Sequence, residues 1–93
     1  MGTSTKKQPG VPQSAMTHRL NRAMGQIRAV QRMLEHPQQY SCKDVVSQLK
    51  AARSALRKAS ELYVGAQITS CASLPEPARS TNIRKALEAL AVD

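Results

Sequence analysis

Residues 42–71 read CKDVVSQLKAARSALRKASELYVGAQITSC, and the apolar residues of this stretch decide the fold. They recur at alternating steps of four and three residues, at Val45, Leu49, Ala52, Leu56, Ala59, Tyr63 and Ala66. This spacing is typical of a heptad seam along one face of a helix. The sequence therefore predicts one long helix over residues 42–71, with Ser41 as its N-cap residue.

Two shorter helices are predicted on either side of the long one. The same spacing recurs at Met16, Leu20, Ala23, Ile27, Val30 and Leu34. It predicts a helix from about residue 15 to His36, with Ser14 as the cap, because Pro37 disfavours helical backbone at the residue before it. After a proline-containing link over residues 72–80, a third helix is expected from a cap near Ser80 or Thr81. Its apolar residues are Ile83, Ala86, Leu87 and Leu90.

Length and composition favour a single all-α domain. The 93 residues include two tyrosines and no other aromatic residue, so the aromatic strand runs of a β protein are missing. We place the domain at residues 15–93, after a disordered basic tail at residues 1–14. A helix over residues 42–71 is about 45 Å long, and the two shorter helices cannot cover its seam. We therefore expect self-association into an antiparallel four-helix-bundle dimer at least.

The charge distribution indicates a polyanionic partner. The net charge is +8, and residues 1–58 carry eleven Lys and Arg against two acids, whereas residues 59–93 carry three against four. Such a surface favours nucleic acid, with an acidic membrane surface as the lesser alternative. The candidate phosphate contacts are basic residues of the first two helices, namely Arg19, Arg22, Arg28, Arg32, Lys43, Lys50, Arg53 and Arg57.

The location we expect for this chain is the cytoplasm. No stretch approaches the roughly 18 apolar residues of a membrane span, and the first residues lack the apolar centre of a signal peptide. We therefore expect no membrane partner. In a reducing cytosol, two cysteines are ligands, reactive thiols or core residues more often than a permanent disulfide.

Cys42 and Cys71 stand at the two ends of the predicted long helix. A rise of 1.5 Å per residue separates them by about 43 Å, so they cannot meet within one chain. In an antiparallel pair of these helices that crosses near Leu56, Cys42 of one chain lies beside Cys71 of the other, and two identical dithiol sites result. Gln67 points to the same side of the helix as both cysteines. The alternative is that each Cys is a small buried hydrophobe, a common fate of free cysteine.

Residues 19–35, RLNRAMGQIRAVQRMLE, resemble the first helix of the CsoR/RcnR family of bacterial transcriptional repressors. The likeness continues through YSCKDVVSQL at residues 40–49, AARSAL at residues 51–56 and Cys71, and it covers residues 16–90. The resemblance implies a three-helix protomer, an antiparallel four-helix-bundle dimer and a homotetramer built from two dimers. It also implies binding of double-stranded operator DNA, often at G-tract-centred inverted repeats. Arg19 and Lys58 match positions at which the family has basic residues implicated in that binding.

The resemblance also bears on the inducer. The family's copper(I) sensors combine the first Cys of one subunit with a His and a Cys of the other, and Gln67 stands here where that His is expected. Its nickel, cobalt and formaldehyde sensors differ further from this sequence. Two cysteines without the histidine look like the CstR branch, in which persulfides and polysulfides cross-link the subunits through a di-, tri- or tetrasulfide. Tyr40 and Gln67 are then expected beside the thiols Cys42 and Cys71.

Three alternatives stay open at this point. Two thiolates also bind copper(I) linearly, so a copper(I)-responsive repressor with Cys42 and Cys71 as metal ligands is the second hypothesis, although no cofactor is required by the first. A DNA-binding protein that senses nothing is the third. His18 and His36 receive no role. We do not expect an enzyme, because the sequence has no Ser/His/Asp or Cys/His grouping, no paired carboxylates and no phosphate-binding glycine loop.

Overall fold

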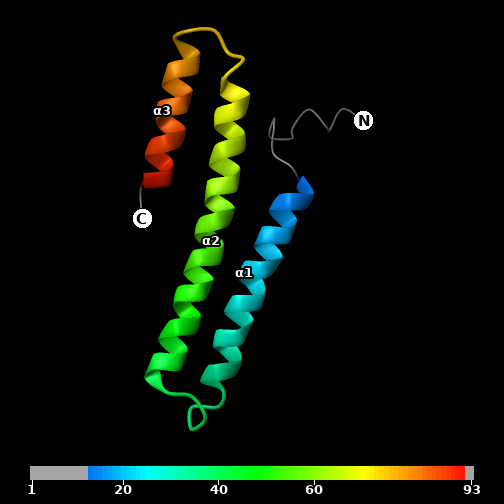
Figure 1. Cartoon of the computed structure of the whole chain (residues 1–93), viewed down its shortest axis with the longest axis vertical. Helices are drawn as coiled ribbons and strands as arrows, with labels where there is room; N and C mark the ends of the chain where they lie inside the picture. The colour runs from blue at the N-terminus through cyan, green and yellow to red at the C-terminus, as the bar shows by residue number, and fades with distance from the viewer. Residues whose placement is uncertain (1–12, 92–93) are drawn as a thin grey trace. The chain divides into compact units, whose positions relative to one another are not determined.

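Three α-helices make up the described part of the chain. A computed structural model describes residues 13–91, with α1 at Gln13–Leu34, α2 at Cys42–Cys71 and α3 at Ala78–Ala91 (Figure 1). Residues 13–91 contain no strand. The prediction of an all-α, three-helix protomer is therefore confirmed. Among the same residues, no helix is long and apolar enough to cross a membrane.

α1 begins and ends two residues earlier than the sequence predicts. Ser14 lies inside its first turn, so the role of N-cap predicted for Ser14 is wrong. At the other end, the amide of Glu35 donates to the carbonyl of Arg32 at 3.1 Å and the amide of His36 to that of Met33 at 3.0 Å. These tighter turns end the helix ahead of Pro37. The tail predicted at residues 1–14 falls on residues 1–12, which lie outside the described residues, and on two residues of α1.

α2 spans residues 42–71 as predicted, and its N-terminus is capped by side chains. The hydroxyl of Ser41 accepts a hydrogen bond from the amide of Asp44 at 3.1 Å, and the Asp44 carboxylate accepts one from the amide of Ser41 at 2.9 Å. This reciprocal pair is a capping box with Asp in place of Glu. It satisfies two backbone donors that the helix leaves unpaired. The cap predicted at Ser41 is confirmed, and it fixes Cys42 as the first residue of α2.

α3 begins at Ala78, inside the segment predicted to be a link over residues 72–80. Ser80 and Thr81 lie in its first turn, so the prediction that either residue caps the helix is wrong. Pro77 directly precedes the helix, and proline is tolerated there because the first amides of a helix have no helical partner. The carboxylate of Glu76 accepts hydrogen bonds from the amide of Ser80 at 3.2 Å and from its hydroxyl at 2.7 Å. Glu76 thus supplies the cap.

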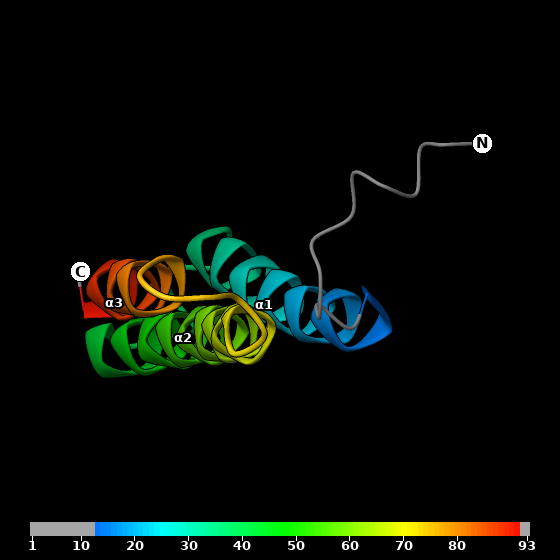
Figure 2. The same cartoon turned by 90° about the horizontal axis from the view of Figure 1, so that it is seen from above.

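The chain divides into two compact units, and α2 runs through both of them. In the unit Thr17–Ala59, α1 lies antiparallel to the N-terminal part of α2 (Figures 1 and 2). The contact between these helices is made by small residues, since Ala23, Ala52 and Ala59 are buried together with Val30. The side-chain amide of Gln48 also donates a hydrogen bond to that of Gln26. The result is a closely packed helical hairpin.

Most large apolar residues of the same seams remain exposed to solvent in this hairpin. Leu20 is 44% exposed, Leu49 is 50% exposed and Leu56 is 46% exposed. Other large apolar residues of this unit behave in the same way, namely Met24, Ile27, Leu34 and Val46. The alanines of the two seams and Val30 are therefore buried within the chain, whereas the leucines of both seams and Ile27 are largely exposed. Large apolar residues left exposed in such numbers are typical of a surface that binds a partner.

The second unit contains the C-terminal part of α2 and the whole of α3, which lie side by side (Figures 1 and 2). Cys71 is buried here, with 9% of its surface exposed. On the outer side of α3, Arg84 and Glu88 form an exposed ion pair at 3.9 Å, a distance at which the contribution to stability is small.

Replacing Ser41 with Ala should lower the free energy of unfolding by about 1 kcal/mol, because one partner of the capping box is lost. Urea denaturation followed by circular dichroism, at one fixed protein concentration, measures the change. Ser47→Ala is the matched control, since Ser47 is exposed inside α2 and alanine favours helix. Equal stability of the two variants would contradict the role given to Ser41.

Acid should loosen the start of α3. Hydrogen bonds from the Ser80 hydroxyl, the Ser80 amide and the Arg79 side chain hold the pKa of Glu76 below its ordinary value. Because the pKa of Glu76 is lower in the folded state, the cap stabilises the helix fully at pH values above the ordinary pKa of a glutamate. This stabilisation is lost as the pH falls through the pKa that Glu76 has in the folded protein. The amide shift of Ser80, followed by NMR against pH, should report that titration. It should be absent in Glu76→Gln.

Candidate nucleic-acid interface and thiol pocket

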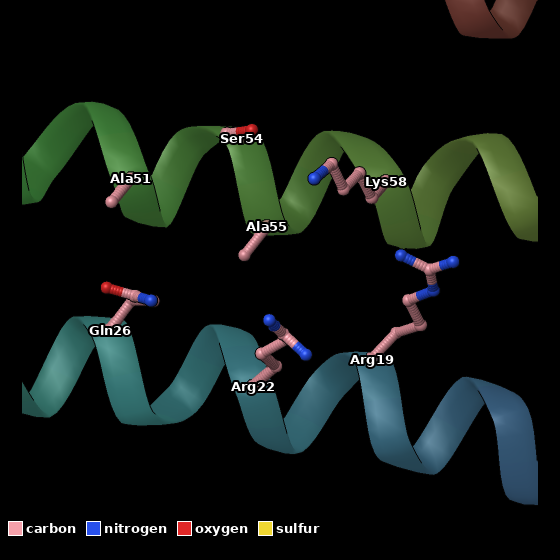
Figure 3. Close-up of a pocket in the computed structure, with 7 residues that line it drawn as sticks. All are labelled: Arg19, Arg22, Gln26, Ala51, Ser54, Ala55 and Lys58. Carbon is pink, nitrogen blue, oxygen red and sulfur yellow. The ribbon is translucent and has the colours of Figure 1, made fainter.

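A basic pocket lies between α1 and α2 in the unit Thr17–Ala59. Its volume is about 200 Å³, and three of its lining residues are cationic, namely Arg19 and Arg22 of α1 and Lys58 of α2 (Figure 3). The rest of the lining consists of small or amide side chains: Gln26, Ala51, Ser54 and Ala55. The figure shows both arginines reaching from α1 towards α2. We call this site the basic pocket.

Helical spacing explains how the basic pocket forms. Arg19, Arg22 and Gln26 follow one another at three and four residues, which places them on one face of α1. On α2, Ala51 and Ala55 have short side chains and leave room beside the long ones. Because α1 and α2 are antiparallel here, the start of α1 lies opposite the middle of α2, and Lys58 joins the two arginines.

The charge of the basic pocket is not compensated by acids. Within residues 13–91, none of Arg19, Arg22 and Lys58 forms an ion pair with a carboxylate. The unit Thr17–Ala59 carries nine Lys and Arg against two acids, Glu35 and Asp44, and the second of these is engaged in the cap of α2. Three cations around a small open pocket suit a phosphate group, for which guanidinium and ammonium groups are the usual protein ligands.

The other basic residues predicted to contact phosphate do not line this pocket. They are exposed along the two helices, at Arg28, Arg32, Lys43, Lys50, Arg53 and Arg57. Arg53 and Arg57 also take part in interactions within the chain. The structure therefore brings together three of the predicted DNA contacts, Arg19, Arg22 and Lys58, and leaves the rest spread over the surface.

Cys71 lines a second pocket, of about 390 Å³, formed by the C-terminal part of α2 and by α3. Gln67 lies in the same lining, one helical turn before Cys71. The remaining lining residues are Tyr63, Val64, Asn82, Lys85, Ala86 and Ala89. We call this site the thiol pocket. The expected neighbourhood of Gln67 and Cys71 is thus present in a single protomer.

Cys42 is not part of the thiol pocket. It is the exposed first residue of α2 and belongs to the other compact unit. Tyr40 precedes it by two residues in the connection from α1, and 38% of its surface is exposed. A site that contains Cys42 together with Gln67 and Cys71 is therefore not formed within one protomer. The sequence predicts such a site only between two subunits.

The described residues of one protomer contain no cluster of three metal-binding side chains. In residues 13–91, no three His, Cys, Asp or Glu side chains gather closely enough to hold a metal ion. The thiol pocket offers a single sulfur, beside amides and the cationic Lys85. His18 and His36 are both exposed, and neither lines the thiol pocket.

Several residues of these pockets were missed by the reasoning from sequence. Gln26 and Ser54 in the basic pocket carry no charge that would single them out. Asn82 and Lys85 share a face of α3 with Ala86 and Ala89, a spacing that is visible in the sequence. That spacing could have marked them as one surface, but only the packing of α3 on α2 connects this surface to Cys71.

Comparison with known proteins adds one finding. A protein-family model for metal-sensitive transcriptional repressors matches residues 13–92, a range that contains all three helices and both pockets. No curated protein matches the sequence in a search of such proteins.

Proposed function

Since this chain belongs to the family of metal-sensitive transcriptional repressors, which is not an enzyme family, we propose that it binds operator DNA and leaves the DNA when its cysteines react. In this proposal the chain binds operator DNA through the basic pocket and the neighbouring basic residues of α1 and α2. It is released when a dithiol site formed by Cys42 of one subunit and Cys71 of another reacts with a persulfide or polysulfide.

The observation that carries the DNA-binding half is the basic pocket. Arg19, Arg22 and Lys58 surround an open space of about 200 Å³, which is large enough to admit a phosphate group, and they have no carboxylate partner in the described residues. The exposed lysines and arginines of the same helices extend the positive surface on both sides. Contacts of this type position a protein on the DNA backbone and make its affinity fall with salt.

The open apolar surface of the hairpin supports self-association. Half-exposed leucines on α1 and α2 lie on the same seams as the buried alanines. A second copy that packs its own hairpin against this surface buries both sets and forms an antiparallel four-helix bundle. Two such dimers form the homotetramer that the family resemblance implies.

The bounds of α2 support the cross-subunit site. Its first residue is Cys42 and its last is Cys71, so the midpoint of the helix falls between Leu56 and Arg57. When two copies of α2 cross at this midpoint, each Cys42 lies opposite the Cys71 of the partner. Leu56, 46% exposed at the crossing, is then covered by the partner helix.

The lining of the thiol pocket favours sulfur chemistry over metal binding. Around Cys71 there are amide, hydroxyl and ammonium groups and no second metal-binding side chain. A persulfide requires only thiols: one thiolate attacks its outer sulfur, a thiol leaves, and the protein keeps a persulfide. Attack by the second cysteine on the inner sulfur then yields an intersubunit disulfide and releases hydrosulfide. Two protein persulfides instead give a trisulfide and hydrogen sulfide.

Copper(I) remains the second candidate inducer, because two thiolates alone can hold it in linear coordination. The family's sensitivity to metals agrees with this alternative. A DNA-binding protein without a sensor is the third candidate, and it leaves the two cysteines at the ends of α2 without a role.

A covalent bridge is coupled to DNA binding through α2. This helix carries Lys58 of the basic pocket and both cysteines. A bond between the end of one α2 and the start of the next fixes the crossing of the two helices, and this changes the spacing of the basic pockets on the DNA. The bridge thereby favours a state with lower DNA affinity.

Lys58→Ala and Arg19→Ala should each weaken binding to a labelled duplex that contains a G-tract-centred inverted repeat. Each phosphate contact that is lost should make the negative slope of log affinity against log salt shallower by about 0.9. Fluorescence anisotropy at several salt concentrations measures both quantities. Arg84→Ala is the control, since Arg84 pairs with Glu88 on α3 and lies outside the basic pocket. Slopes that match the control in both variants would contradict the proposed contacts.

An organic persulfide should release the reduced protein from the same duplex and leave a cross-link between Cys42 and Cys71 of different chains. Anisotropy follows the release, and mass spectrometry without reductant identifies the number of bridging sulfurs. Cys42→Ser should keep its DNA affinity and lose the response. Release of Cys42→Ser to the full extent would refute the dithiol mechanism. Release of the wild-type protein by copper(I), at one ion per subunit, would favour the second candidate.

A further inference from the structure

The thiol pocket is larger than attack on a single sulfur atom requires. Its volume of about 390 Å³ lies in the range of small-molecule sites, which is roughly 300 to 1,000 Å³. Val64, Ala86 and Ala89 give it apolar walls, and Tyr63 and Asn82 add a hydroxyl and an amide. A few polar groups in an apolar lining are what such sites use to orient a ligand.

Lys85 is the one charged residue in this lining. It forms no ion pair within residues 13–91, where the neighbouring acid on α3, Glu88, pairs with Arg84 instead. The thiol pocket therefore contains, in the same lining as Cys71, an ammonium group that no carboxylate among residues 13–91 pairs with. An ammonium group in this setting attracts a carboxylate, for which it offers three donors.

We propose that the thiol pocket binds the carboxylate end of a small organic persulfide and directs its outer sulfur to Cys71, with Lys85 as the positioning residue. This inference rests on the proposed function and deepens it, because it names the chemical class of the sulfur donor. The carboxylate lies against Lys85, the carbon chain lies along the apolar wall, and the amides of Gln67 and Asn82 orient the polar groups.

The transfer step is balanced without a further reagent. The thiolate of Cys71 attacks the outer sulfur of the persulfide R–S–SH, and a new bond joins the two sulfurs. The bond between the outer and inner sulfurs of the donor breaks, and its electron pair leaves on the inner sulfur as R–S⁻. This thiolate takes up the proton that Cys71 gave up. The donor is thereby reduced to a thiol, and Cys71 is oxidised to a persulfide.

A pair of alkylating reagents tests the charge preference apart from sulfur chemistry. Iodoacetate and iodoacetamide modify thiols by the same reaction, and only iodoacetate carries a carboxylate. Lys85→Met should lower the ratio of the iodoacetate rate to the iodoacetamide rate at Cys71 by about two- to fivefold, the effect of one partly exposed ion pair. The ratio at Cys42 should stay unchanged, and high salt should reduce the effect at Cys71. Peptide mapping by mass spectrometry gives both ratios in one sample.

Arg84→Met is the matched control, because it removes a charge from α3 outside the thiol pocket. Both substituted side chains are exposed, and circular dichroism checks that the helices are retained. A fall in the ratio at Cys71 that is equal in Lys85→Met and Arg84→Met would overturn the proposal. So would no fall in either variant.

The persulfides of 3-mercaptopropionic acid and of its amide then test the ligand class. The acid should release the wild-type protein from DNA at a lower concentration than the amide, and Lys85→Met should remove the difference. If the two release the wild-type protein equally, the selection of anionic donors is overturned and the proposed function stands. If neither releases DNA while the alkylation ratios depend on Lys85, the anion pocket stands, but its assignment to sulfur donors and the proposed inducer are both overturned.

Discussion

The rest of the structure depends on the seam of α2, which one chain cannot bury alone. Within the hairpin, α1 covers the alanines of that seam, because their short side chains allow the two helices to approach closely. The leucines of the same seam, Leu49 and Leu56, keep about half of their surface exposed. In the proposed antiparallel dimer, a second copy buries these leucines, and the free energy of that burial is gained only on assembly. Folding and assembly are coupled in that proposal.

The positions of the helices were predictable where local chemistry decides them and less so where it does not. The heptad spacing and the Ser41 cap predicted α2 at about residues 42–71, and the structure has these bounds. The predicted start of α3 was too late because Pro75 and Pro77 both indicate that no helix is present there. In the structure, Pro77 directly precedes the helix and Glu76 caps its first turn. The predicted start of α1 was two residues too late because Ser14 resembles an N-cap residue. Its predicted end was two residues too late because the helix ends at Leu34, three residues before Pro37.

Some residues of the candidate sites could likewise be predicted from the sequence, and others depend on how the helices pack. The basic charge of the first helix pointed to Arg19 and Arg22, and the family resemblance pointed to Lys58. The pocket that these residues line depends on α1 lying antiparallel to α2, which is a property of the packing. The pairing of Gln67 with Cys71 follows from one helical turn and was predictable. The contribution of Lys85 was not, since nothing local connects residue 85 to residue 71. Only the return of α3 along α2 brings them together.

The two pockets occupy different compact units, and a single uninterrupted helix is shared between them. This arrangement has a consequence for divergence within the family. Under the proposed function, substitutions around Cys71 and on the facing side of α3 alter which small molecule is recognised, while the proposed phosphate contacts in the other unit stay as they are. A handful of changes near the C-terminus would then reassign the proposed repressor to a new chemical signal with its operator retained.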